Sequence, residues 1–323
     1  MNHKPLSTAA VFAVGILTLS GCAGSPAAGP SSTGETGEIK SIFFANPLPS
    51  YPDWATADTC FRDATAKYGI DGKTSGPTGL SVDNQFVLDR ITQSIAQQPD
   101  AIIMVPIVPA QYEPLMKQAK SKGIRVVTLN TGDSTTTQDF TIGTEYSKMG
   151  AAVAQAIGKR GGQQNVGIIT NAPGGVGDVI INALKENLPE NVKAVTTAYD
   201  NGDPNKTADT VTAMLKANPE INLVYSWQGT AVGGITASIK EQGLVGKTVG
   251  VVNDLTPQVQ DGINDGTLYG TSKQDFCAMT TKTVENLVKL SKGEEVPANT
   301  DTGTTFVTKE NLAEALASGT ATK

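Results

Sequence analysis

Short apolar runs alternate with helix-like stretches along most of the chain, and this rhythm constrains the fold more than any other feature. The runs lack polar alternation, which is typical of strands buried on both faces. We predict strands over 41–45, 101–105, 125–129, 165–170, 192–198, 222–226, 248–252 and 267–273. Apolar residues at helical spacing predict helices over 54–68, 83–97, 111–122, 146–159, 178–187, 205–217, 231–242, 257–264 and 277–291, before a short terminal strand and helix. The alternation predicts an α/β fold with doubly wound parallel sheets.

A polar segment, Asp133–Asp139, interrupts this rhythm near the middle of the chain. The 323 residues are enough for two lobes with separate cores, because domains usually run to ~100–200 residues. A hydrophobic fraction of 39% argues against a disordered chain. We therefore predict two α/β lobes, although the halves share only their rhythm and no sequence repeat.

The first 22 residues indicate export. Met1–Lys4 is weakly positive, and the apolar run 9–19 is too short to span a bilayer stably. Leu19-Ser20-Gly21-Cys22 resembles a bacterial lipobox, in which Cys22 is acylated and becomes the new N-terminus. The alternative is an ordinary cleaved signal with a chance cysteine. We predict a lipoprotein signal peptide over 1–22, a Pro/Gly-rich flexible linker over 23–38, and an extracytoplasmic protein lipid-anchored to the cell membrane.

The composition excludes several functional classes. A net charge of −6 without a basic cluster disfavours nucleic acid as a partner. The single histidine, His3, lies in the predicted signal peptide, so the mature chain lacks the commonest general base and a common metal ligand. The Gly-rich segment Asn171–Asp178 matches neither a Walker A loop nor Gly-x-Gly-x-x-Gly, and is better explained as a loop bordering a cleft. We predict no catalytic residues, no metal and no cofactor; enzyme activity is a remote alternative.

Two further cysteines, Cys60 and Cys277, remain after Cys22. An even number in an exported protein favours a disulfide between them. Two buried free thiols are the alternative.

Polar and indole side chains follow several predicted strands. Ligands of open α/β sheets bind beyond the carboxyl ends of the strands, so these positions are candidate ligand contacts. They are Tyr51, Asp53, Trp54, Asn130, Thr131, Trp227, Gln228, Asn253, Asp254 and Gln274. Carboxylate and amide groups pair with adjacent sugar hydroxyls, and indole faces stack on the C–H faces of a sugar ring. The alternatives are helix capping for the polar residues and core packing for the tryptophans.

Several segments in order resemble one known family. Tyr51–Trp54, Ile95–Ile103, Ala119–Asn130, Ala231–Gly234, Val251–Asp254 and Lys292–Pro297 are similar to successive motifs of the type I periplasmic sugar-binding proteins, the ribose-binding-protein-like group. The resemblance extends from Ile39 to about Gly293. It implies two doubly wound parallel-sheet lobes joined by a three-crossing hinge, with crossings near 138–141, 273–276 and 302–304. It also implies a first lobe of residues 39–139 and 275–302, and a second of 140–274 and 303–323.

The resemblance also implies a function. The chain is expected to be the substrate-binding lipoprotein of an ABC importer, a monomer that closes on a monosaccharide or polyol and delivers it to a membrane permease. Carried over by position, Tyr51, Asp53, Trp54, Asn130 and Thr131 would line the first lobe. The second lobe would contribute Asp178, Trp227, Gln228, Asn253 and Asp254, with Gln274 at the hinge. The alternative is a ligand-sensing receptor that feeds a membrane signalling protein. A transcription regulator of this fold would carry an N-terminal helix-turn-helix in place of the signal peptide.

The sequence also departs from the family pattern. Ribose-binding members usually place arginines after the fourth strand and in a second-lobe helix, where this chain has Thr131 and Asp178 or Val179. Asp53 partly replaces the usual Phe. We therefore expect a less cationic pocket, which disfavours ribose and leaves a polyol, another monosaccharide or an amine-bearing ligand open.

Overall fold

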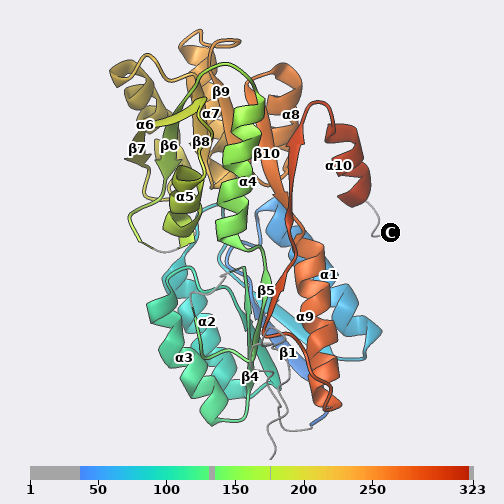
Figure 1. Ribbon diagram of the computed structural model, residues 1–323. Coiled ribbons are helices and arrows are strands. Elements are labelled where there is room, and N and C mark those ends of the chain that lie inside the picture. Colours follow the sequence, from blue (N-terminus) through green and yellow to red (C-terminus); the bar gives the residue numbers. More distant parts are fainter. Residues whose placement is uncertain (1–36, 131–134, 175, 320–323) are drawn as a thin grey trace, which may run out of the picture. The chain divides into compact units, whose positions relative to one another are not determined.

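A computed structural model describes residues 37–319 of the chain, apart from 131–134 and 175. The described residues belong to one compact unit and form two six-stranded sheets, each covered by helices on both faces (Figure 1). We call the two sheets with their helices lobe 1 and lobe 2. Cys22, the predicted lipobox and most of the predicted linker lie outside the described residues.

Lobe 1 contains the sheet β11-β5-β4-β3-β1-β2, in which every neighbouring pair is parallel. Its strands are β1 (Ser41–Ala45), β2 (Asp71–Ser75), β3 (Ala101–Met104), β4 (Arg125–Leu129), β5 (Phe140–Gly143) and β11 (Asn299–Asp301). Its helices are α1 (Pro52–Lys67), α2 (Asn84–Gln97), α3 (Pro109–Ser121) and α9 (Phe276–Ser291).

Lobe 2 contains the sheet β12-β10-β9-β8-β6-β7, which is parallel except that β12 runs antiparallel to β10. Its strands are β6 (Gln164–Thr170), β7 (Val192–Tyr199), β8 (Leu223–Ser226), β9 (Val249–Asn253), β10 (Leu268–Gln274) and β12 (Thr304–Thr308). Its helices are α4 (Tyr146–Lys159), α5 (Val176–Glu186), α6 (Pro204–Ala217), α7 (Val232–Glu241), α8 (Pro257–Asp265) and α10 (Leu312–Gly319), with a 3-10 turn η2 at Gly229–Ala231.

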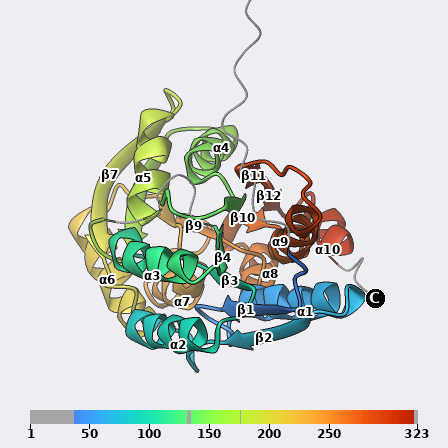
Figure 2. The ribbon, with the colours of Figure 1, turned by 90° about the horizontal axis from the view of Figure 1, so that it is seen from below.

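Alternate residues of the central strands pack into different layers. In β1, Ile42 and Phe44 pack with α1 and α9, whereas Phe43 and Ala45 pack with α2 and α3. Figures 1 and 2 accordingly show α2 and α3 together on one side of the sheet and α1 and α9 on the other. Because both faces are buried, these strands appear in the sequence as continuous apolar runs. Lobe 2 is built in the same way, with α4 and α5 on one face and α6, α7 and α8 on the other.

Both sheets have the same strand order. Numbered within its lobe, each sheet runs 2-1-3-4-5 and ends in a sixth strand, β11 or β12, from the C-terminal part of the chain. The order reverses between β1 and β3 and again between β6 and β8. Such reversals separate the loops that follow neighbouring strands and so leave a crevice at the carboxyl ends.

The chain passes between the lobes three times, after β5, after β10 and between β11 and β12. The first crossing comes later than expected, because Phe140–Gly143 pairs with β4 and belongs to lobe 1. The boundary expected at 139/140 therefore moves beyond Gly143. Neither this strand nor β2 was predicted from the sequence.

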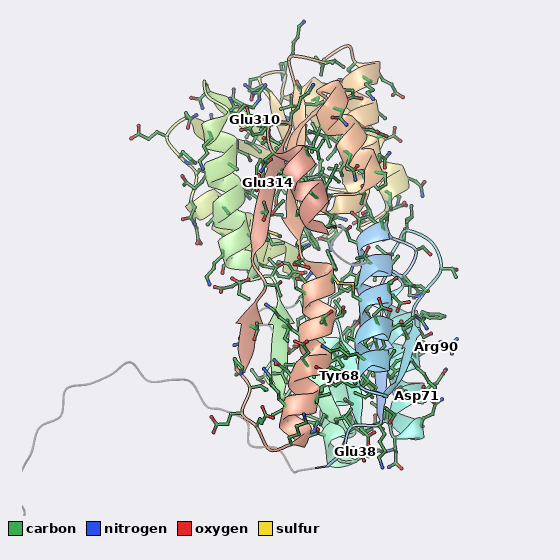
Figure 3. The ribbon with its side chains drawn as sticks, turned by 90° about the vertical axis from the view of Figure 1, so that its right-hand side faces the viewer. Glu38, Tyr68, Asp71, Arg90, Glu310 and Glu314 are labelled. Atoms are coloured by element: carbon green, nitrogen blue, oxygen red, sulfur yellow. A yellow bond between two sulfur atoms is a disulfide. The ribbon has the colours of Figure 1, made fainter. Side chains whose placement is uncertain are left out.

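One disulfide ties the start of lobe 1 to its late helix. Cys60 in α1 is bonded to Cys277 in α9, with their Cα atoms 5.3 Å apart and a sequence separation of 217. Figure 3 draws this bond in yellow. Both helices cover the same face of the first sheet. Among the described helices, none has the length and apolarity needed to cross a bilayer.

Candidate ligand-binding cleft

A cavity of about 280 Å³ lies between the carboxyl ends of the two sheets. Its size is close to the lower end of small-molecule sites, ~300–1,000 Å³. Segments after the strands of both lobes supply its walls, including those on either side of each order reversal. The lining residues are Pro47, Leu48, Tyr51, Trp54, Leu80, Val82, Asn84, Val105, Pro106, Ile107, Asn130, Tyr146, Asn171, Val176, Asn201, Gly202, Trp227, Gln228, Gly229, Thr230, Asp254, Gln274 and Phe276.

Asp254, directly after β9, is the buried carboxylate of this cavity. Its Oδ2 accepts a hydrogen bond from the Tyr51 hydroxyl at 3.1 Å, and its Oδ1 accepts one from Gln274 Nε2 at 3.0 Å. Burial raises the pKa of Asp254 well above its ordinary value, and the nearby charge of Asp53 raises it further. The hydrogen bonds from Gln274 and Tyr51 act in the opposite direction. A carboxylate this costly to bury is typical of a functional site.

Gly229 allows the two lobes to approach at Asp254. A Cβ atom added to Gly229 would overlap the Tyr51 hydroxyl and would lie 2.8 Å from Asp254 Oδ2. Tyr51 belongs to lobe 1, whereas Gly229 and Asp254 belong to lobe 2. The absence of a side chain at Gly229 is therefore a condition for the hydrogen bond between the lobes.

The two tryptophans lie on opposite walls. Trp54 packs edge-on against Phe276, with ring centroids 4.8 Å apart. Trp227 donates from Nε1 to the Thr170 hydroxyl at 3.0 Å, and its indole sits over Gly177, where a Cβ atom would lie 2.7 Å from Nε1. Both indoles are partly buried against the core of their lobe and also line the cavity. Each wall thus presents an immobilised aromatic ring.

Two glutamine side chains on the cavity wall carry buried oxygens without a partner. These are Gln228 Oε1 and Gln274 Oε1. A buried acceptor without a hydrogen bond costs about 1–3 kcal/mol, so it favours a ligand that donates. Sugar and polyol hydroxyls are such donors.

Seven of the residues expected from the sequence line this cavity. They are Tyr51, Trp54, Asn130, Trp227, Gln228, Asp254 and Gln274. Asn130 has a left-handed backbone (φ 56°), and its Oδ1 accepts from the Thr144 amide at 3.1 Å. That oxygen is therefore engaged in holding the crossing after β5.

Three expected residues, Asn253, Asp178 and Asp53, are described by the structure and do not line the cavity. Asn253 ends β9 with its amide in the lobe 2 interior, where Nδ2 lies 3.8 Å from Met149 Sδ. Because side chains alternate along a strand, Asn253 points away from the position that Asp254 occupies. Asp178 lies in the first turn of α5, and its carboxylate accepts from the Gly174 amide at 2.7 Å. Asp178 thus stabilises its own loop. Thr131 lies outside the described residues.

Asp53, the third of these residues, lies beside the hinge segments and not in the cavity between the sheets. It lines a separate cavity with Leu255 and Lys273, both in lobe 2. Burial raises the pKa of Asp53, while a hydrogen bond from the Leu255 backbone and the charge of Lys273 lower it. Tyr51 and Asp53, at the start of α1, point in different directions. Tyr51 therefore lines the cavity between the sheets, whereas Asp53 contacts lobe 2 in the separate cavity. We correct its expected role from ligand contact to interlobe contact.

Several lining residues were not singled out from the sequence. Asn201 follows β7, so the strand-end rule applied to every strand would have found it. Asn171, in contrast, opens the segment Asn171–Asp178 that was expected to border a cleft, and it lines the cavity. Tyr146 begins α4 after the first crossing, and burial with the charge of Asp254 raises its pKa. Leu80 and Val82 lie in the segment between β2 and α2, and no sequence pattern marks them.

No lysine or arginine is among the described residues that line the cavity. The described residues likewise contain no cluster of three or more His, Cys, Asp or Glu able to hold a metal ion. The only acidic residue on these described walls is Asp254, so the described site is rich in acceptors and carries no cation.

A family model described as a periplasmic binding protein domain matches residues 42–295. The chain belongs to this family. The xylitol-binding protein of Mycolicibacterium smegmatis is 26% identical over 238 residues, which cover 69% of this chain. The match spans 65% of that relative, just under two thirds of its length. The predicted family resemblance is therefore confirmed.

Solved structures of sugar-binding proteins share the fold. A glucose-galactose binding protein from Geobacillus stearothermophilus has a TM-score of 0.81 at 20% identity, covering 85% of this chain and 99% of that chain. A solute-binding protein from Burkholderia graminis, in complex with D-arabinose, has a TM-score of 0.77 at 24% identity, covering 86% and 98%. The two-lobed α/β fold predicted from the sequence is confirmed. The family and these relatives are binding proteins, not enzymes.

Proposed function

We propose that the protein is the extracytoplasmic, lipid-anchored substrate-binding component of an ABC importer, and that it binds a monosaccharide or polyol between its lobes. The observation that carries the proposal is the cavity between the carboxyl ends of the two sheets, with Asp254, Gln228 and Gln274 as its buried acceptors. The relatives that bind xylitol and D-arabinose support the ligand class. The apolar run before Cys22 supports the anchor.

Hinge closure gives this arrangement its mechanism. A ligand that contacts both walls stabilises only the closed form, so it shifts the equilibrium by its differential affinity for that form. Going from 1:99 to 99:1 needs roughly 5.5 kcal/mol, which a few hydroxyls paired with buried acceptors and one ring on an indole can supply. The closed surface is then what the permease recognises.

The direct test is a thermal-shift screen of the purified mature chain against pentoses, hexoses and their polyols, followed by calorimetry. A ligand at 100 times its Kd adds roughly 2.7 kcal/mol to the unfolding free energy. The Gln228→Leu variant should bind the ligand tenfold or more weakly, because Leu cannot accept a hydrogen bond from a ligand hydroxyl. Gln258→Leu, at an exposed position of the same lobe, is the matched control. Equal affinity in both variants would exclude Gln228 from the site.

Transport and sensing are separated in the cell. A deletion strain that no longer accumulates the labelled ligand supports the importer role. A strain that accumulates it normally but loses a transcriptional response supports the receptor alternative. Release of the protein from membranes by Cys22→Ser, detected by fractionation, tests the anchor.

A further inference from the structure

The two walls of the cavity differ in chemistry. Lobe 2 and the hinge contribute most of the polar side chains, namely Asn171, Asn201, Gln228, Thr230, Asp254 and Gln274. Lobe 1 contributes mainly hydrocarbon, namely Pro47, Leu48, Leu80, Val82, Val105 and Ile107. A ligand with hydroxyls on every side would be well matched by the first set and poorly by the second.

The polar groups on the lobe 1 wall are largely engaged elsewhere. Asn84 donates to Gln111 and accepts from the Tyr112 hydroxyl, so its amide is turned into the lobe. The Asn130 oxygen is held by the Thr144 amide. The Tyr51 hydroxyl donates to Asp254. A hydroxyl placed against this wall would lose hydrogen bonds to water and find few replacements, which disfavours its binding.

Leu80 and Val82 extend the apolar wall outward. Leu80 is 52% exposed and Val82 is 42% exposed, although both line the cavity. Val105 and Ile107, after β3, line the same cavity and pack with the core of lobe 1. An apolar group lying along this wall would be removed from water without displacing any hydrogen bond of the protein. Each buried CH₂ group would then strengthen binding about fourfold.

We propose that the ligand is a sugar or polyol carrying an apolar substituent, with its hydroxyls against lobe 2 and its hydrocarbon against the lobe 1 wall that ends in Leu80 and Val82. The proposal rests on the proposed function, since it assigns a ligand subclass to the same cavity. The acceptors without partners, Gln228 Oε1 and Gln274 Oε1, are both on the polar wall or hinge, so the hydroxyls of the ligand would be bound there. The group that lies against the lobe 1 wall is therefore proposed to be alkyl or aryl.

The test is calorimetric titration of the mature chain with D-xylose, D-glucose and D-galactose and with the methyl, butyl and phenyl β-glycosides of each. At least one butyl or phenyl glycoside should bind ten times or more tighter than its methyl glycoside. The double variant Leu80→Ser/Val82→Ser should bring that ratio to about twofold or less. Val245→Ser, which changes a valine that is 49% exposed and does not line the cavity, should leave the ratio unchanged.

The outcomes separate the two proposals. If a free sugar binds and its butyl and phenyl glycosides bind no better than its methyl glycoside, the apolar subsite is overturned while the proposed function stands. A gain that persists in the Leu80→Ser/Val82→Ser variant also overturns the subsite. If no sugar, polyol or glycoside binds, both proposals fail.

Discussion

The hydroxyl of Tyr51 in lobe 1 lies 3.1 Å from Oδ2 of Asp254 in lobe 2, and this hydrogen bond joins residues 203 positions apart. It forms inside the cavity that we propose as the ligand site. A hydrogen bond of this kind contributes roughly 0.5–1.5 kcal/mol net, and this one links the two lobes directly. The same carboxylate therefore serves closure and, in our proposal, ligand binding.

Gly229→Ala should hinder closure. The added methyl group would occupy the position of the Tyr51 hydroxyl, so the lobes could not approach as they do here. We expect ligand affinity to fall tenfold or more. In small-angle X-ray scattering, the ligand-saturated variant should have a larger radius of gyration than the wild type.

The methyl group of Gly229→Ala would also lie 2.8 Å from the Asn253 carbonyl oxygen, within lobe 2. Combining the variant with Tyr51→Ala distinguishes hindered closure from such damage within lobe 2. Tyr51→Ala removes the overlapping phenol, so the double variant should lose less affinity than the two single losses added together. Strictly additive losses would contradict a clash between the lobes.

The unfolding free energy of the unliganded protein should fall as pH rises from about 4 to 8. Burial raises the pKa of Asp254 to about 8, so the folded state keeps a proton that the unfolded state releases near pH 4. Stability is then complete below the unfolded pKa and is lost as pH rises through the folded pKa. Urea unfolding at pH 4.5, 6 and 8 measures this slope.

Asp254→Asn should flatten the slope and raise stability at pH 8 by about 1–3 kcal/mol, because it removes a buried charge. The Asn amide still fits, since the Tyr51 hydroxyl can accept from Nδ2 while Oδ1 accepts from Gln274. Asp53 retains part of the slope, because burial also raises its pKa. Asp261→Asn, at an exposed position in α8, serves as the control. Parallel pH curves for wild type and Asp254→Asn would refute the assignment.

Gly177→Ala should weaken ligand binding without touching the ligand. Its methyl group would press on the Trp227 indole, since a Cβ atom there lies 2.7 Å from Nε1 and 3.0 Å from Cε2. Overpacking of this kind costs about 1–3 kcal/mol, so we expect an affinity loss of about tenfold by calorimetry and a shift in tryptophan fluorescence.

Gly233→Ala is the matched control for that variant. Gly233 also lies in a lobe 2 helix, but a Cβ atom there meets only the flexible end of Gln258, at 3.1 Å. Ala is the better helix former, so this variant should keep its affinity and gain up to ~1 kcal/mol of stability. Equal affinity in both variants would show that ligand binding does not depend on the packing of Trp227 against Gly177.

The sequence predicted the strands that are buried on both faces, because a short apolar run without polar alternation is typical of such strands. Ser41–Ala45 and Arg125–Leu129 have the predicted bounds. Asp71–Ser75 was missed because it is a polar edge strand, and Phe140–Gly143 because a polar segment precedes it. Edge strands are fixed by hydrogen bonds to a neighbour, which no local pattern records.

The site was predictable as far as strand ends define it. The rule located Asp254, Gln274 and both tryptophans, because parallel strands bring their carboxyl ends to one edge. It did not separate Asn253 from Asp254, since only the phase of the strand decides which one faces the cavity. It also gave no sign that Leu80 and Val82 line the cavity, because loop geometry depends on tertiary contacts.

Loss of the disulfide should lower stability while leaving ligand binding intact. The Cys60–Cys277 bond closes a loop that contains most of lobe 2, so its removal frees a long segment in the unfolded state. Such a bond contributes typically 2–5 kcal/mol. Both cysteines lie in helices of lobe 1, on the face away from α2 and α3, and neither lines the cavity. The variant Cys60→Ala/Cys277→Ala should therefore unfold several degrees lower than the wild type in calorimetry and keep its ligand affinity within about twofold.

Reduced wild type should unfold at the same temperature as the variant, whereas adding a reductant to the variant itself should change nothing. An unchanged unfolding midpoint in the variant would mean that the packing of α1 on α9 alone supplies the constraint.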